Sequence, residues 1–235
     1  MTLTMQPPRP HVAILFLGLT AFTCISAASQ PQHSASSRPC PRSDVRVYAA
    51  DARDVRDGCR GARAALEFLK PHTSKPIKNL TIEVHENLPA AASPTAVGAY
   101  LKECSCSMFV PYASFREQKT WFNLPVSRDL YRSLATHEAA HAVADHIFEI
   151  PSPTILAKEY VAYVTMFATM DPVLRARVLR ALPGTGFASE DHISLVFYMF
   201  DPMRFGAESY RHYLKPENGA AFLQFVFAGK ALSID

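Results

Sequence analysis

Apolar and polar residues alternate over short runs in the first half of the chain. Residues 80–84 read LTIEV, in which every second side chain is aliphatic. A period of two is typical of a strand with one buried face, so a strand is predicted within residues 76–89. Similar short runs predict further strands at 45–50, 96–101, 106–112 and around 120–124.

In the second half the pattern changes to helical spacing, and capping residues mark the helix starts. Ser127 is a candidate N-cap for a helix that runs to about Phe148. Ser-Pro or Asp-Pro pairs at 152–153, 171–172 and 201–202 each join a capping side chain to a proline suited to the first helical turn. Helices are predicted over about 54–70, 127–148, 152–170, 171–184, 190–199, from 201 onward, and from 217 to 228.

Strands fill the first half and helices the second, an order that predicts the α+β class. The chain has 235 residues, of which 49% are apolar, and shows no internal repeat, so residues 44–235 are expected to form one domain. The formal net charge is only +3, without a block of Lys and Arg or a basic stripe interleaved with aromatic residues. Nucleic-acid binding is therefore not expected, and nothing argues against a monomer.

The first 28 residues predict export. Arg9 is followed by about a dozen apolar residues and then by the small residues 26–28, the pattern of a cleavable signal peptide. This apolar run is shorter than the roughly 20 residues that span a membrane. We expect cleavage after Ala28 and a secreted or periplasmic protein without stable membrane insertion, with retention as an anchor as the alternative. Residues 29–43 are polar and rich in Pro and Ser, which predicts a flexible leader.

Export changes the interpretation of the cysteines. Once Cys24 is removed with the signal peptide, four remain, and an even number in an oxidising compartment predicts two disulfides. A bond between Cys104 and Cys106 would close a very tight loop, so we expect Cys40 and Cys59 each to pair with one of those two. A four-cysteine zinc site is the alternative, but the sequence lacks a Cys-x2-Cys pair.

The sequence HEAAH at residues 137–141 carries the strongest candidate chemistry. On a helix, His137 and His141 lie one turn apart with both imidazoles on one side, where they can bind one metal ion. Zinc suits two imidazoles plus a carboxylate, with a fourth position left for water. Glu138 lies about 100° round the helix and can act on that water as a general base. The alternative is chance together with core packing.

Glu159 is the preferred third ligand. It follows His141 by 18 residues, in the next predicted helix, after a turn that lets that helix fold back on the first. His146 projects from the wrong face, and Glu149 is about 12 Å further along the helix. A metal would also explain an acid in an otherwise apolar stretch. Asp171 is the alternative.

HEAAH, followed by a helix with Glu159 in AKEYVAYV, resembles the gluzincin group of zinc metallopeptidases, and in particular its small, secreted, uncharacterised bacterial members. The resemblance covers residues 76–170. It implies a zincin-like α+β fold, in which a mixed, mostly antiparallel N-terminal sheet precedes a helical half that carries the HExxH helix. It also implies that an edge strand, 96–101 or 106–112, binds the substrate peptide in an extended conformation.

The same resemblance assigns roles to four residues. His137, His141 and Glu159 would bind one Zn²⁺ per chain, and Glu138 would be the catalytic base.

Many gluzincins carry an aspartate that orients a histidine, and here that position is Tyr163. Support for the ligands is expected instead from Asp145, Asp171 or a backbone carbonyl. No motif marks the residue that stabilises the oxyanion; the candidates are Tyr163, His192, Tyr198, Tyr210 and His212, and for each a structural role at the rim of the core is the simpler interpretation.

The sequence therefore predicts an exported zinc-dependent peptidase, a hydrolase of peptides or proteins bound in extended conformation. Glu138 would take a proton from metal-activated water and pass it to the leaving amine. One alternative is a catalytically inactive protein of the same fold that binds peptides. Another is a metal-dependent hydrolase of a different bond. The presence of Glu138 favours catalysis, whereas the missing aspartate favours binding alone.

Overall fold

The structure is a computed structural model and describes residues 36–41, 43–89 and 96–234. The predicted signal peptide at 1–28 and the first part of the predicted leader lie outside the described residues. All of the described residues belong to one compact unit. Among the described helices, none has the length and apolar character needed to cross a membrane.

Five strands form one mixed sheet in the order β1-β2-β3-β5-β4. The central strands β2, β3 and β5 are parallel, while β1 and β4 pair antiparallel at the two edges. The α+β class and the mixed sheet are thus confirmed, but the sheet is not mostly antiparallel. The reason is that the helix α1 connects β2 to β3, and such a crossover joins parallel strands. The strands are β1 (Ser36–Pro39), β2 (Val45–Ala49), β3 (Leu80–Val84), β4 (Gly98–Leu101) and β5 (Cys106–Phe109).

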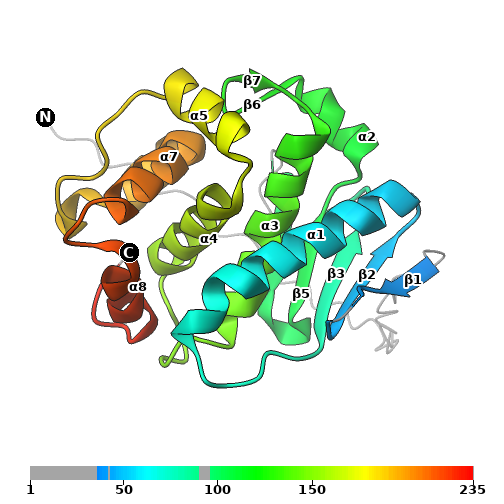
Figure 1. Cartoon of the computed structure of the whole chain (residues 1–235), viewed down its shortest axis with the longest axis horizontal. Helices are drawn as coiled ribbons and strands as arrows, with labels where there is room; N and C mark the ends of the chain where they lie inside the picture. Colours follow the sequence, from blue (N-terminus) through cyan, green and yellow to red (C-terminus); the bar gives the residue numbers. More distant parts are fainter. Residues whose placement is uncertain (1–35, 42, 90–95, 235) are drawn as a thin grey trace, which may run out of the picture. The chain divides into compact units, whose positions relative to one another are not determined.

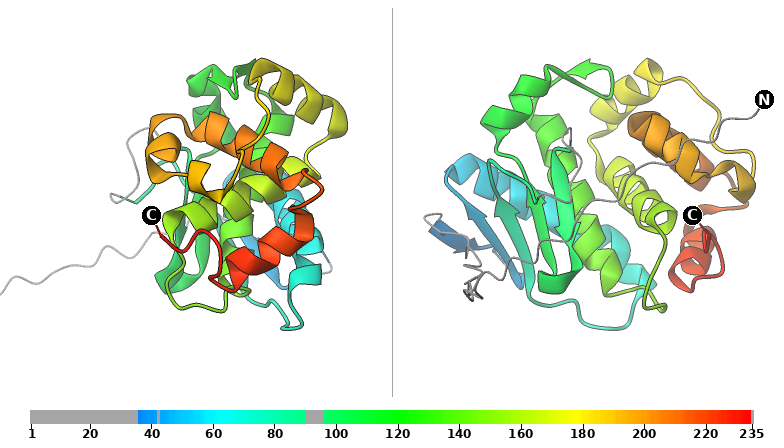
Figure 2. Two further views of the ribbon diagram at one scale, coloured as in Figure 1. Left: turned by 90° about the vertical axis from the view of Figure 1, so that its left-hand side faces the viewer. Right: turned by 180° about the vertical axis from the view of Figure 1, so that it is seen from behind.

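One face of this sheet is covered by two helices, α1 (Ala52–Leu69) and α3 (Arg128–Asp145) (Figures 1 and 2). In β2 and β3 the aliphatic side chains all lie on this buried face, and the residues between them point to the other face, as the period of two predicts. The two helices touch each other closely, because a β-carbon at Gly61 of α1 would lie 2.7 Å from the backbone of Ala135 in α3. Small residues on both helices therefore permit this contact.

The helix α4 (Ile155–Thr169) packs against α3, and α7 (Pro202–Tyr213) packs against α4 (Figure 1). Three predicted N-caps are confirmed, since Ser127, Asp171 and Asp201 accept hydrogen bonds from the first turns of α3, α5 (Pro172–Ala181) and α7. The cap of α4 is Thr154 instead of Ser152.

Several short elements complete the described chain. The predicted strand around residues 120–124 is a hairpin of two very short strands, separate from the main sheet. The helix predicted at 190–199 is a 3₁₀ turn followed by α6. These elements are α2 (Tyr112–Phe115), β6 (Thr120–Trp121), β7 (Leu124–Pro125), α5 (Pro172–Ala181), α6 (Leu195–Phe200), α8 (Gly219–Phe227), and the 3₁₀ turns η1 (Lys70–His72), η2 (Lys102–Cys104), η3 (Arg116–Gln118) and η4 (Glu190–His192).

Part of the predicted flexible leader is ordered. Residues 36–39 form β1 and pair antiparallel with β2, so the prediction of a flexible segment up to residue 43 was wrong for them. Their Pro/Ser-rich composition does not encode this pairing. The segment is held because the next residue, Cys40, is buried and bonded to Cys59 of α1.

The predicted disulfide connectivity was also wrong. The structure pairs Cys40 with Cys59 and Cys104 with Cys106. Cys40 follows β1, whereas Cys106 begins β5, and β2 and β3 lie between those strands. Three strand spacings amount to roughly 14 Å, which is too far for a disulfide, whose Cα atoms lie within about 7 Å. The tight Cys104–Cys106 loop is accommodated by Ser105 at a positive φ of 50°, which brings the two Cα atoms to 5.1 Å.

Candidate functional site

The HEAAH sequence lies in the last three turns of α3, on the side that faces α4. His137, Glu138 and the alanines around them are buried between the sheet, α1 and α4. The Oγ of Ser107 in β5 donates a hydrogen bond of 2.7 Å to the carbonyl oxygen of Glu138. This bond ties the motif-bearing turn of α3 directly to the sheet.

Glu159 reaches the same place from α4. The turn after α3 reverses the chain, and Thr154 then starts α4 by accepting a hydrogen bond from the amide of Ala157. Glu159 follows in the second turn of α4, with its side chain only 14% exposed. The predicted folding back of the second helix on the first therefore occurs, and it brings the carboxylate to the two histidines.

The two imidazoles and the carboxylate form one tight cluster. The Nε2 atoms of His137 and His141 are 3.2 Å apart. Glu159 approaches His137 Nε2 to 3.5 Å through Oε2 and His141 Nε2 to 3.4 Å through Oε1. Of the described residues, only these three form a group of His, Cys, Asp or Glu side chains with the geometry to share a metal ion. Asp171, the alternative third ligand, caps α5 instead.

Burial and mutual charge set the protonation of this cluster. Burial lowers the pKa of His141 to about 4. Burial would also lower the pKa of His137, but the hydrogen bond and charge of Glu159 outweigh it and raise that pKa. Conversely, burial would raise the pKa of Glu159, and the neighbouring histidines hold it below its usual value. His137 and Glu159 thus behave as one hydrogen-bonded pair.

Glu138 is separate from this cluster and faces β4. Burial raises the pKa of its carboxyl to about 8. The carboxylate lies against Gly98, because a β-carbon there would overlap its oxygen and carbon atoms. In the register of β4 and β5, Gly98 pairs with Phe109, and Tyr100 pairs with Ser107. All four residues lie on the face of the sheet that the helices cover. Edge strand β4 therefore runs directly past the carboxylate.

Sequence reasoning missed Gly98, Tyr100 and Ser107, which surround the cluster from the sheet. The Tyr100 ring stacks at 6.4 Å from the ring of His141, and its hydroxyl donates to Asp145. Burial, followed by the charge of Asp145, raises the pKa of Tyr100 to about 12. No local motif marks these residues, since their proximity to α3 depends on strand pairing.

The expected support for the ligand histidines takes another form. Asp145 bonds Tyr100, and Asp171 caps α5, so neither carboxylate holds His137. Tyr163 packs its ring 4.4 Å from the ring of His137, and Gly206 of α7 lets the backbone approach Tyr163 closely. The Nδ1 of His137 is buried without a hydrogen-bond partner among the described residues. On its Nδ1 side, this imidazole is therefore held by packing and not by a hydrogen bond.

Of the five oxyanion candidates, two lie at the cluster. Tyr198, from α6, lies beside Glu159 and lowers the pKa of its carboxyl, and Tyr163 packs on His137. The other three make contacts typical of structural roles. His212 bonds the Tyr160 hydroxyl at 2.8 Å, Tyr210 stacks on Phe167, and the exposed His192 bonds Ser189.

Fold and site together define an α+β protein in which two packed helices hold a cluster of two histidines and one glutamate beside an edge strand. The chain belongs to a family of unknown function, DUF6639, which it matches over residues 45–234. It matches no curated protein and no solved structure. The resemblance to gluzincins therefore depends on the motif alone.

Proposed function

We propose that this protein is an exported zinc-dependent peptidase whose metal is held by His137, His141 and Glu159. The observation that carries the proposal is the clustering of the ligand atoms: the two Nε2 atoms are 3.2 Å apart, Glu159 Oε2 is 3.5 Å from His137 Nε2, and Glu159 Oε1 is 3.4 Å from His141 Nε2. Ligands about 2.0–2.1 Å from a tetrahedral zinc ion lie roughly 3.3–3.4 Å from one another. The two imidazole nitrogens are thus close to the spacing that such an ion requires, and the ligand atoms of all three side chains lie within 4.8 Å of one another.

The donor set also fits zinc chemically. Two imidazole nitrogens and one carboxylate oxygen, with a fourth position free, are the ligands of catalytic zinc sites. When bound, zinc would polarise the substrate carbonyl and lower the pKa of water. Glu138 is the base beside this cluster, and it would accept the proton of the attacking water and deliver it to the leaving amine. Tyr198 is the better placed of the two tyrosines to donate to the developing negative charge.

The position of β4 supports a peptide substrate. β4 is an edge of the main sheet, and its described residues pair only with β5. An extended peptide that added to this edge would run past Gly98 and hence past the Glu138 carboxylate. This arrangement favours a substrate bound through its backbone.

A second candidate is a protein that binds zinc and peptides without cleavage. The partnerless Nδ1 of His137 favours it, because a metal-binding imidazole usually donates its other N–H to a carboxylate or carbonyl. Such support orients the ring and raises ligand basicity, and its loss typically costs about 10–100-fold in metal affinity or activity.

One experiment separates these candidates. The zinc content of chain 29–235 would be measured beside that of the His137→Ala/His141→Ala and Glu138→Gln variants, and each would be incubated with a peptide library. The peptidase proposal expects one equivalent of zinc in the wild type and Glu138→Gln, none in the double variant, and cleavage by the wild type alone. Zinc binding without cleavage would establish the second candidate. Absence of zinc after reconstitution would overturn both.

A further inference from the structure

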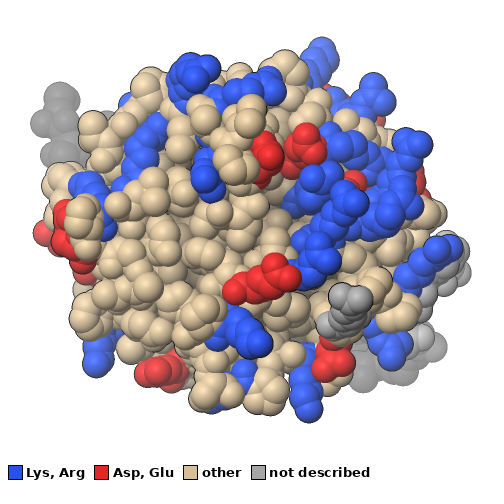
Figure 3. Space-filling view, in the orientation of Figure 1, with Lys and Arg blue, Asp and Glu red and all other residues tan. Residues whose placement is uncertain are grey.

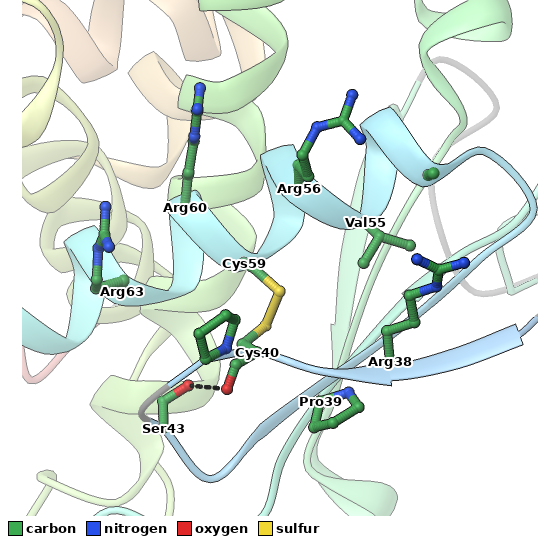
Figure 4. A pocket seen from close by; sticks show the side chains of 11 residues that line it. Arg38, Pro39, Cys40, Ser43, Val55, Arg56, Cys59, Arg60 and Arg63 are labelled. Atoms are coloured by element: carbon green, nitrogen blue, oxygen red, sulfur yellow. Dashed lines mark hydrogen bonds between the residues drawn. A yellow bond between two sulfur atoms is a disulfide. The ribbon is translucent and has the colours of Figure 1, made fainter.

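A pocket of about 500 Å³ lies between β1 and the N-terminal part of α1 (Figure 4). Arg56, Arg60 and Arg63 extend in one direction from successive turns of α1, and Arg38 points from β1 toward the same helix. The Cys40–Cys59 disulfide closes the base of the pocket. In the space-filling view, Lys and Arg side chains gather over this part of α1 (Figure 3).

The helix α1 separates its charges onto two sides. Two of its three acidic residues, Asp54 and Asp57, are buried against α3, where Arg128 forms ion pairs of 2.5 and 2.9 Å with them. These carboxylates are therefore neutralised away from the pocket. The arginines of α1 that line the pocket are on the exposed side.

The pocket arginines have little compensating charge. Within the described part of the chain, no ion pair is formed by Arg38, Arg56 or Arg60. Arg63 meets Glu67 at 3.8 Å, but the two side chains are 66% and 74% exposed, so the pair contributes little. Like charges three and four residues apart on a helix destabilise it. A bound anion would remove this repulsion.

We propose that this pocket binds an organic ligand that carries at least two phosphate groups. Four arginines line this one pocket, and arginine matches oxyanions of high charge density, since each guanidinium can donate two parallel hydrogen bonds to a phosphate. The volume lies in the range of small-molecule sites and exceeds the needs of one phosphate ion. The remaining walls include apolar surface for an organic part, from Pro39, Ala52, Val55 and the disulfide.

This site is distinct from the histidine cluster and does not rest on the proposed peptidase function. The pocket lies at the β1 edge of the sheet, and the cluster lies near β4, the opposite edge. The diphosphate group could belong to a free metabolite or to a lipid headgroup, and the two sources offer the arginines the same chemistry.

The test uses inorganic pyrophosphate as the free probe, with calorimetric titration of the full chain. Arg56→Gln/Arg60→Gln is compared with Arg177→Gln/Arg180→Gln, which removes the same charge from exposed positions on α5. We expect the first variant to weaken binding at least about tenfold and the control to leave it within about twofold. Arg56→Lys/Arg60→Lys, which keeps the charge, should recover only part of the affinity, because lysine lacks the paired donors.

Two further measurements complete the test. The His137→Ala/His141→Ala chain should bind pyrophosphate as tightly as the wild type, which excludes a metal in the cluster as the binding group. Sedimentation with phosphatidylcholine vesicles, with and without cardiolipin, identifies the source, since capture only by cardiolipin vesicles that depends on Arg56 and Arg60 would indicate a headgroup. Equal weakening by the pocket and control variants, or binding to neither pyrophosphate nor cardiolipin, would overturn the proposal.

Discussion

The carboxylate of Glu138 in α3 occupies the space that a β-carbon at Gly98 of β4 would need. Neither residue is close to the other in the chain, and only the edge strand brings them together. The general base proposed for this protein is therefore positioned by a glycine on the strand along which a substrate would lie.

Replacing this glycine should impair hydrolysis without loss of metal. In Gly98→Ala the new methyl group must displace the Glu138 carboxylate, and a shift of about 1 Å in a catalytic group can cost about a hundredfold in rate. We expect kcat to fall by that order, with zinc content unchanged. Ala99→Ser is the matched control, because residue 99 lies on the other face of β4. Equal activity of the two variants would show that Glu138 is not the base.

The third-ligand assignment predicts a large effect of Glu159→Ala on zinc affinity. Loss of groups that merely support a ligand weakens metal binding about 10–100-fold, so loss of the ligand itself should exceed that range. Competition against a chromophoric chelator measures the affinity directly. Glu149→Ala serves as the control, because Glu149 is exposed and follows α3. If Glu159→Ala binds zinc as tightly as Glu149→Ala, the assignment is wrong.

The position of the Tyr198 side chain beside Glu159 predicts a supporting role for α6. Tyr198→Phe should weaken zinc binding about tenfold, since the hydroxyl orients the carboxylate that holds the metal. Tyr210→Phe should have no such effect, because that ring stacks on Phe167 away from the cluster. Unchanged zinc affinity in Tyr198→Phe, combined with a lower kcat, would instead assign the hydroxyl to the transition state.

His212 predicts a pH dependence of stability. It is buried, and burial, reinforced by the charge of Lys215, lowers its pKa to about 4 from an unfolded value of 6.5. The unfolded chain binds this proton more readily, so the free energy of unfolding falls as the pH drops from about 6.5 to about 4, by at most about 3 kcal/mol.

The variant His212→Asn isolates this effect, because its amide oxygen can still accept from the Tyr160 hydroxyl but does not titrate. Urea denaturation of both chains without metal, at several pH values, gives the difference in unfolding free energy. We expect the wild type to lose stability relative to the variant below pH 6.5. A difference that does not change with pH would contradict the predicted protonation.

The sequence by itself determined the local features of this protein. Capping residues such as Ser127, Asp171 and Asp201 marked the helix starts, because a cap acts on amides two or three residues away. The spacing of His137 and His141 placed both imidazoles on one side of α3 for the same local reason. A single short turn then sufficed to predict that Glu159 would return to them.

Only the tertiary structure decided the remaining features, each of which depends on which strands pair and in what order. The parallel pairing of β2, β3 and β5 separates Cys40 from Cys106 and so determines the disulfides. The same sheet brings Gly98 to Glu138 at one edge and Arg38 to the arginines of α1 at the other. Strand pairing joins residues far apart in the chain through backbone hydrogen bonds, and these bonds depend little on the side chains. No local sequence pattern therefore specifies which strands pair.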